Sequence, residues 1–275
     1  MKKTLVVPVD FSASSVNAVN YAADFAKASG ASIALLHICD VPVISQEPVP
    51  AEVIDELLEE AKKKMEELKQ NLHHKTGNEL TISAEVRVGP VYSQIQDYCA
   101  TAQQPIVIMG AHMTTATERM IFGSNVLRAM QNLCWPLIVV PNGIRFTGIG
   151  VAGLACDLRD VPATVHAESL IKWLGNFHPQ LHILHITPKK HGMLDADEIK
   201  GAGILKEALK TFNPVFHYMQ DENTEEAIAA FAEKNNLNLL VIIPKKHDLL
   251  NQLLHKSHSK QMIINTHIPI MAIHQ

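Results

Sequence analysis

A stretch with two glycines, VIMGAHMTTATERMIFGSNV (residues 107–126), has the residue types of a turn that approaches a phosphate group. An apolar run stops at Gly110, a polar segment follows, and Gly123-Ser124 begins a segment with a helical pattern. The first turn of a helix carries unpaired N–H groups and a partial positive charge, which suit phosphate. Ser124 adds a hydroxyl donor at this point. The stretch therefore predicts an anion-binding turn between a strand and a helix.

An acidic residue, Asp10, ends the first apolar run of the chain. In an open parallel sheet, ligands bind beyond the carboxyl ends of the strands, where the strand order reverses. Asp10 and Gly110 follow strands that we expect to be neighbours there. A carboxylate repels phosphate but accepts hydrogen bonds from a ribose or a base. The P-loop spacing GxxxxGK[ST] is absent and no lysine follows Gly123, so a P-loop ATPase is not expected.

The hydropathy pattern indicates the elements that position these residues. The first half contains short, continuous, β-branched apolar runs, which are typical of strands buried on both faces of a parallel sheet. Helical patterns lie between them: one is capped by Ser12 and stopped by Gly30, one spans 51–75, and one follows Gly89-Pro90. The apolar runs are TLVVPVD (4–10), SIALLHIC (32–39), TISAEVRV (81–88), PIVIMG (105–110) and PLIVVP (136–141). The alternation predicts an α/β fold with helices on both faces of an open sheet.

The second half of the chain repeats this order. Its first apolar run ends at Asp157 as the first run of the chain ends at Asp10, and His185 matches His37. The repeated runs are GIGVAGLACD (148–157), LHILHITP (181–188), NLLVIIP (238–244) and IPIMAIH (268–274). A period near 140 residues suits a duplicated domain rather than a solenoid. We predict domains at 1–143 and 144–275, joined by the linker PNGIRFTG (141–148).

The composition excludes several classes of function. Hydrophobic residues make up 47% and charged residues 19%, so a large core is expected and long disorder is not. A net charge of -4 argues against broad binding to nucleic acid or anionic membrane. No apolar run approaches the roughly 18 residues of a spanning helix. The four cysteines show no CxxC spacing and indicate reduced thiols, so we expect a cytoplasmic protein with no membrane and no nucleic-acid partner.

These features together resemble the universal stress protein family, as two fused copies of its domain. The resemblance rests on VPVDFS (7–12), LLHI (35–38), the spacing from Gly110 to Gly123-Ser124, and PLIVVP. It implies two tandem flavodoxin-like (adenine nucleotide alpha hydrolase-like) domains, each with a parallel five-stranded sheet in the order 3-2-1-4-5. It also implies a pseudo-symmetric internal dimer in which the fifth strands, PLIVVP and IPIMAI, meet, because their apolar edges would otherwise be bare. A further homodimer is left open.

The resemblance also implies a ligand, ATP or another adenine nucleotide, in the first domain. Nucleotide-binding members carry G-x-x-G, nine residues, then G-S or G-T; Gly110, Gly123 and Ser124 fit, but Met113 replaces the second glycine. A side chain there would crowd the ligand, and a positive φ would add strain. The implied binding residues are Pro8, Val9, Asp10, Ile38, Met109, Gly110, His112, Met113, Gly123, Ser124 and Asn125.

The function expected from the resemblance is a cytoplasmic stress-response protein, regulatory or sensory rather than catalytic. One alternative is that the glycine turn is kept only for packing and that the protein is a scaffold or chaperone-like protein acting through its surfaces. A slow nucleotide hydrolase is a third hypothesis, but no general base or pair of metal-binding carboxylates supports it. A triad of Ser124, His112 and Asp10 lacks the G-x-S-x-G elbow, and no metal site is expected.

The second half has lost the glycines of the turn. Pro244 stands at the place of Gly110, and Ser257 lies close to that of Ser124. Because proline lacks the N–H group, the ordinary nucleotide mode is not expected in this half. His255 and His258, three residues apart, are interpreted as surface or core-edge histidines rather than metal ligands.

The motif PKKH occurs twice in the second half, at 188–191 and 244–247, after the strands expected to flank its first strand. One hypothesis is an anion site built from side chains, in which Arg159 joins the lysines. The alternative is that the lysines only keep two loops soluble. The lysines of this hypothetical site are Lys189, Lys190, Lys245 and Lys246.

Overall fold

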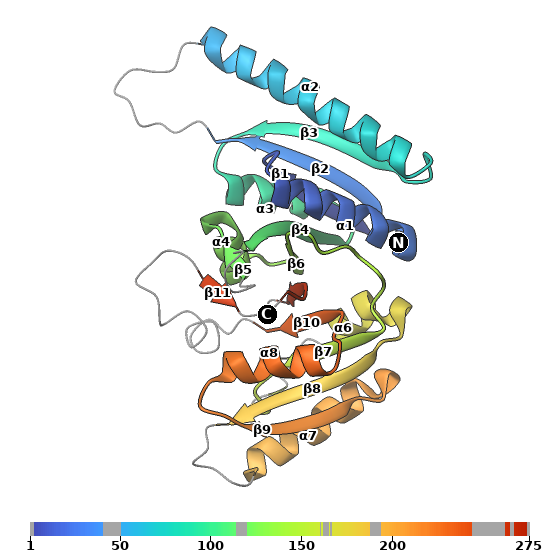
Figure 1. The fold of residues 1–275 in the computed structure, drawn as a ribbon, viewed down its shortest axis with the longest axis vertical. Coiled ribbons are helices and arrows are strands. Elements are labelled where there is room, and N and C mark those ends of the chain that lie inside the picture. The colour runs from blue at the N-terminus through green and yellow to red at the C-terminus, as the bar shows by residue number, and fades with distance from the viewer. Residues whose placement is uncertain are drawn as a thin grey trace, which may run out of the picture.

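The computed structural model describes residues 3–40, 51–113, 120–159, 161, 165, 167–187, 194–243, 262–264 and 267–273 (Figure 1). In the first half, strands and helices alternate as the sequence predicts. The elements are β1 (Thr4–Val9), α1 (Ala13–Ser29), β2 (Ser32–Cys39), α2 (Ala51–Lys75), β3 (Ile82–Val88), α3 (Val91–Thr101), β4 (Pro105–Met113), β5 (Met120–Phe122), α4 (Ser124–Asn132) and β6 (Leu137–Pro141).

The second half follows the same plan with a shorter second helix. Its elements are β7 (Val151–Ala155), α6 (Ala167–Leu174), the 3-10 turn η1 (Gly175–Phe177), β8 (Gln180–Thr187), α7 (Ala196–Ala208), the 3-10 turn η2 (Lys210–Phe212), β9 (Val215–Gln220), α8 (Thr224–Lys234), β10 (Leu239–Ile242), β11 (Met262–Ile264) and β12 (Ile270–Ala272).

Helix α1 shows why the local sequence was sufficient for its boundaries. Ser12 caps its start by accepting a hydrogen bond from the N–H of Ser15 at 3.3 Å. Gly30 ends it in the left-handed conformation, with φ of 68°, and donates its N–H to the carbonyl of Ala26. Both ends therefore lie where the sequence predicts.

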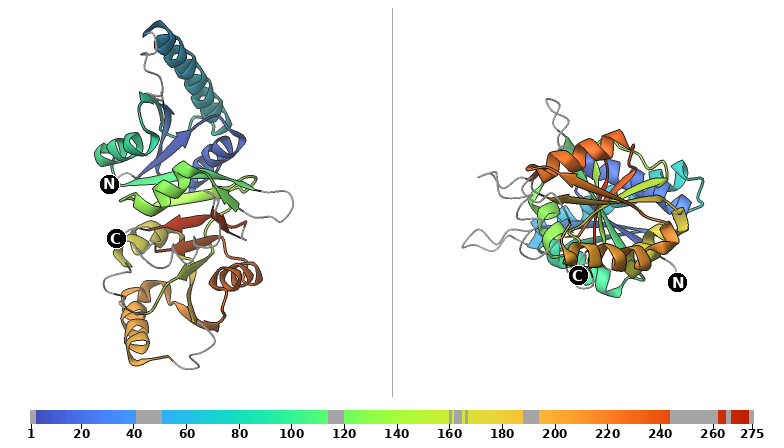
Figure 2. Two further views of the ribbon diagram at one scale, coloured as in Figure 1. Left: turned by 90° about the vertical axis from the view of Figure 1, so that its left-hand side faces the viewer. Right: turned by 90° about the horizontal axis from the view of Figure 1, so that it is seen from below.

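The sheet confirms the predicted strand order in both halves. The order is β3-β2-β1-β4-β6-β12-β10-β7-β8-β9, so each half runs 3-2-1-4-5 when β5 and β11 are set aside. All pairs along this path are parallel except β6 with β12, which are antiparallel and centred on Ile138 opposite Met271. The two fifth strands thus meet as expected, and the halves share one continuous sheet along the long axis of the molecule (Figures 1 and 2).

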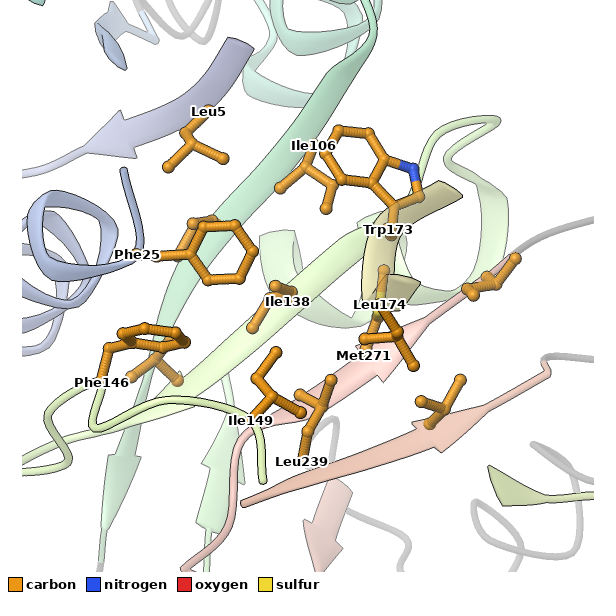
Figure 3. Packing of buried hydrophobic residues seen from close by; sticks show 14 of the residues in the cluster. Leu5, Phe25, Ile106, Ile138, Phe146, Ile149, Trp173, Leu174, Leu239 and Met271 are labelled. Carbon is orange, nitrogen blue, oxygen red and sulfur yellow. The ribbon is translucent and has the colours of Figure 1, made fainter. Parts of the chain in front are cut away.

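Helices cover both faces of this sheet, and each face has its own hydrophobic core. One core contains side chains of α1, α2, α6 and α7, and the other contains side chains of α3, α4 and α8. Both cores cross from one half to the other at β6 and β12. Figure 3 shows this crossing in the first core, where Ile138 and Met271 lie among residues of both halves.

The linker between the halves is packed rather than free. Phe146 contacts Phe25 of α1 and Phe177 of η1, with ring centroids 5.0 and 5.7 Å apart. The side-chain amide of Asn17 donates to the carbonyls of Pro141 and Ile144, each at 3.1 Å. The segment therefore helps to hold the second half against α1, while the predicted boundary at 143/144 stays a prediction.

Candidate functional site

The strand order reverses between β1 and β4, as the sequence predicts. The β1–β2 ladder continues to Val9 opposite His37, whereas the β1–β4 ladder ends at Val6 opposite Val107. Proline at position 8 has no N–H to extend that ladder. The carboxyl ends of β1 and β4, with buried Val9 and Met109, therefore border the switch point where a ligand is expected.

Asp10 lies directly after β1 and is held by the start of α1. Its Oδ1 accepts hydrogen bonds from the N–H and the hydroxyl of Ser12, and its own N–H donates to Oγ of Ser15. Partial burial raises the pKa of Asp10, but the hydrogen bonds from Ser12 and Ser15 outweigh it, so the pKa lies below its ordinary value. Asp10 is thus an ionised, oriented acceptor at the switch point, and it also shapes the turn.

Sequence reasoning missed Phe11 as a neighbour of this site. Phe11 has a φ of 62°, which is rare for a bulky residue, and its ring lies 4.7 Å from that of His37. Nδ1 of His37 lies 2.7 Å from the carbonyl oxygen of Val9, so this histidine has a hydrogen-bond partner at the end of its strand. Ile38 follows in β2 and is half-buried. A large aromatic residue directly after Asp10 was the available clue.

Packing against α1 explains why residue 110 is a glycine, without reference to a ligand. A Cβ atom at this position would overlap the carbonyl group of Ser14 and lie 3.0 Å from the nitrogen of Ser15. The amino end of α1 can therefore rest on β4 only because residue 110 has no side chain. This contact also brings Asp10 and Gly110 to one place, through Ser14 and Ser15.

Gly123 shows the opposite situation. It has an ordinary φ of -68°, and a Cβ atom there would meet no atom of the described residues within 4 Å. It caps α4 without a side-chain hydrogen bond, and the first helical bond runs from the N–H of Leu127 to the carbonyl of Gly123 at 3.0 Å. Ser124 and Asn125 are exposed. Within the described residues, neither packing nor backbone geometry requires a glycine at 123, and nothing covers this position at the amino end of α4.

The structure corrects the expectation that the fourth strand stops at Gly110. β4 continues to Met113, and β5 pairs with it through His112 opposite Ile121 and Met113 opposite Met120. Met113 therefore has extended backbone, and the expected strain from a positive φ is wrong. His112 is exposed. The polar residues after Gly110 hid this extension, because they break the apolar pattern of a buried strand.

Residues 1–141, slightly more than half of the chain, match the model of the Universal stress protein family. The chain belongs to this family. A universal stress protein of Methanocaldococcus jannaschii is 28% identical over 144 residues, which cover 50% of this chain and 81% of that protein.

Two solved structures show that the fold extends over both halves. A universal stress protein from Archaeoglobus fulgidus is similar over 98% of each chain, with a TM-score of 0.71 and 16% identity. A functionally unknown protein from Pseudomonas aeruginosa is similar over 98% of this chain and 92% of its own, with a TM-score of 0.55 and 11% identity. The expected pair of flavodoxin-like units in this universal stress protein is confirmed.

In the second half, side chains close the region that corresponds to Asp10 and His37. Arg159 contacts Asp195 at 2.8 Å and Glu198 at 3.1 Å. Glu198 is buried, accepts the N–H of Asp195 at 2.9 Å, and lies 3.4 Å from Nε2 of His185. The charge of Arg159 is thus already neutralised, contrary to its expected part in an anion site. The lysines of that site lie outside the described residues, as do Pro244, Ser257, His255 and His258.

Three further properties bear on the kind of site present. Within the described residues, no group of three or more His, Cys, Asp or Glu side chains could hold a metal ion. In the same part of the chain, no helix has both the length and the apolar character needed to cross a membrane. A cavity of about 400 Å³ lies between linker residues 143–148 and the turn from α8 to β10, away from Asp10 and Gly123.

A histidine pair in the second half should make stability depend on pH. Nδ1 of His182 and Nε2 of His217 lie 2.8 Å apart. Burial lowers the pKa of both, and the proximity of His217 lowers that of His182 further. The unfolded chain therefore binds protons first as the pH falls below about 6.5. The contribution of the uncharged pair to the free energy of unfolding is therefore fully present above about pH 6.5 and is lost as the pH falls below it.

We expect the denaturant concentration at the unfolding midpoint of the native protein to decrease as the pH is lowered from 7 to 5. A His217→Phe variant should show a shallower fall over the same range, because it removes one of the two groups. Equal slopes for the two proteins would contradict this assignment.

Proposed function

We propose that this universal stress protein binds an adenine nucleotide, such as ATP, at the switch point of its first half. The observation that carries the proposal is the amino end of α4, where the described part of the chain gives Gly123 no packing or backbone reason to be glycine. The N–H groups of Ser124, Asn125 and the following residue have no helical partner, and they suit a phosphate group. Asp10 supplies an ionised acceptor on the β1 side, suited to the hydroxyls of ribose or to a base.

In this proposal the outcome of binding is regulatory, in the cytoplasm, and not catalytic. Pro8, Val9, Ile38 and Met109 line the switch point from the strands, and His112 lies beyond Gly110 in β4. Pro8, Val9, Ile38 and Met109 offer shape and apolar contact rather than acid–base chemistry. The proposal assigns no nucleotide to the second half, where Arg159, two residues after the counterpart of Asp10, is paired with Asp195 and Glu198.

A scaffold that acts through its surfaces without a nucleotide remains the second candidate. The observation in its favour is Gly110, whose presence is fully explained by the contact between β4 and Ser14. Gly110 therefore cannot be used as evidence of a ligand, and Gly123 decides between the two functions.

The decisive experiment replaces Gly123 by valine. The new side chain would stand over the amino end of α4 and block phosphate from its N–H groups. Losing one or two charge-assisted hydrogen bonds should weaken ATP binding on the order of 100-fold. Because no described residue lies within 4 Å of that position, the thermal midpoint should stay close to the native value. Calorimetric titration with ATP and a melting curve measure the two effects.

Gly203→Val is the matched control, since Gly203 also has open space around it but lies in α7 of the second half. It should leave ATP affinity unchanged. A Met113→Gly variant should bind ATP more tightly if the methionine crowds the ligand. The proposal is wrong if neither the native protein nor Met113→Gly binds ATP.

A further inference from the structure

We propose that strand β11, from the end of the second half, holds the phosphate-binding turn of the first half in its binding position. Nucleotide binding in one half and the docking of the other half are then coupled. This inference rests on the proposed function, because it concerns the same turn at Gly123.

The first observation is the position of β5. Its three residues, Met120–Phe122, directly precede Gly123. On one side β5 pairs with β4, and the pairs within the described residues are His112 with Ile121 and Met113 with Met120. A two-stranded hairpin is at best marginally stable by itself. β4 alone is therefore a weak support for the turn.

The second observation is the partner on the other side of β5. β11 pairs antiparallel with all three residues, as Met262 with Phe122, Ile263 with Ile121 and Ile264 with Met120. β5 is thus the central strand of a small three-stranded antiparallel sheet. One of its two ladders is therefore supplied by the second half of the chain.

The third observation is the burial of β5. Met120 and Phe122 are fully buried, in the core that also contains Val126 and Met130 of α4. The side chain of Phe122 therefore connects the position of β5 to that of α4. A shift of β5 moves Gly123, and the unpaired N–H groups of α4 move with it.

The last observation links β11 to the interface between the halves. β11 and β12 lie close together in the chain, and β12 pairs antiparallel with β6 just as β11 pairs with β5. The central pair of the β5–β11 ladder is Ile121 with Ile263, and the central pair of the β6–β12 ladder is Ile138 with Met271. In both ladders a strand of the first half thus pairs with its counterpart in the second half. When the second half docks through β12, it also brings β11 against β5. The same docking step therefore positions Gly123 and the amino end of α4.

Coupling of this kind is reciprocal. Loosening β11 from β5 lowers the affinity for nucleotide, and bound nucleotide strengthens the β5–β11 ladder by the same factor. A nucleotide in the first half can thereby change how firmly the second half is held, which is a route from binding to a regulatory output.

The test uses the full-length protein and two neighbouring proline variants, Ile263→Pro and Ile264→Pro. Successive N–H groups of a strand point to opposite sides, and β5 is the one partner of β11 in the described part of the chain. One variant therefore deletes a ladder hydrogen bond, while in the other the lost N–H faces away from β5. Each variant is the control for the other.

Two measurements are made, calorimetric ATP affinity and hydrogen exchange of residues 120–128 without nucleotide. The variant that loses the ladder bond should bind ATP about tenfold more weakly, within the usual range of coupling between sites. It should also exchange the amides of 123–127 faster. The other variant should change both quantities clearly less. In the native protein, ATP should slow the exchange of the amides of 262–264.

The outcomes separate this inference from the function on which it rests. If the native protein does not bind ATP, the proposed function fails, and the exchange of 123–127 in the nucleotide-free variants still decides whether β11 holds the turn. If the native protein binds ATP but neither variant changes affinity or exchange, the inference is overturned. Should both variants fail to fold, the native protein decides alone, because unchanged exchange of 262–264 on adding ATP would also overturn it.

Discussion

Replacing Gly110 by alanine is expected to lower the free energy of unfolding by about 3 kcal/mol or more, the upper part of the range for an overpacked site. The added Cβ atom would overlap the carbonyl group of Ser14. This obstacle is backbone at the first turn of α1, so no side-chain rotation can relieve it. The amino end of α1 would have to move away from β4, which would also disturb the Ser15 and Asp10 contact. Urea denaturation measures the loss.

Gly123→Ala is the matched control in the same segment. Its backbone has an ordinary φ of -68° and open space around the position, so alanine should be accepted with little change in stability. Equal stability of the Gly110→Ala variant and the native protein would show that α1 does not rest on β4 as described. The two glycines that the sequence presents as one motif are thus expected to act in different ways, Gly110 through packing and Gly123 through the ligand.

Replacing Gly201 by alanine should cost about 3 kcal/mol or more for the same reason. Gly201 lies in α7, and a Cβ atom there would overlap the carbonyl oxygen of Leu158 and lie 3.0 Å from Cγ2 of Val161. To relieve the overlap, α7 must move away from the turn after β7. That movement separates Arg159 from Glu198 and leaves a buried carboxylate without its cation. Thermal or urea unfolding of the second half measures the effect.

Gly203→Ala, two residues along the same helix, is a control that should raise the free energy of unfolding. Gly203 is exposed, and no described residue lies within 4 Å of its Cβ position. Alanine also favours a helix over glycine by about 1 kcal/mol. The Gly203→Ala variant should therefore be slightly more stable than the native protein. Similar effects of the two substitutions would contradict the close packing of α7 on Leu158.

Together these contacts explain why the two halves, with the same fold, are proposed to have different roles. In the first half, no described residue contacts the Cβ position of Gly123, and Asp10 is exposed with a lowered pKa. In the second half, α7 is packed tightly through Gly201, and Glu198 is buried beside His185 and contacts Arg159. Among the described residues, the equivalent regions of the two halves thus differ in their charged contacts.

Much of the fold was predictable because its determinants are local. The apolar runs and the helical patterns identified the main strands and helices of both halves, and the caps Ser12 and Gly30 set the ends of α1. The repeat of the pattern indicated two matching units, and the family resemblance supplied the strand order and the meeting of the fifth strands. The meeting of Asp10 with the Gly110 region was also predictable, since carboxyl ends of parallel strands share one edge.

Other features were accessible only from the folded chain, because each depends on segments far apart in sequence. The reason for Gly110 lies in Ser14, and the charge of Arg159 is neutralised by the carboxylates of Asp195 and Glu198. The strands β5 and β11 have three residues each, too few to show a period, and they pair across the junction of the two halves. Short strands gain their hydrogen bonds only when a distant partner is already in place. For that physical reason the local pattern does not contain them, and the docking of the two halves creates them.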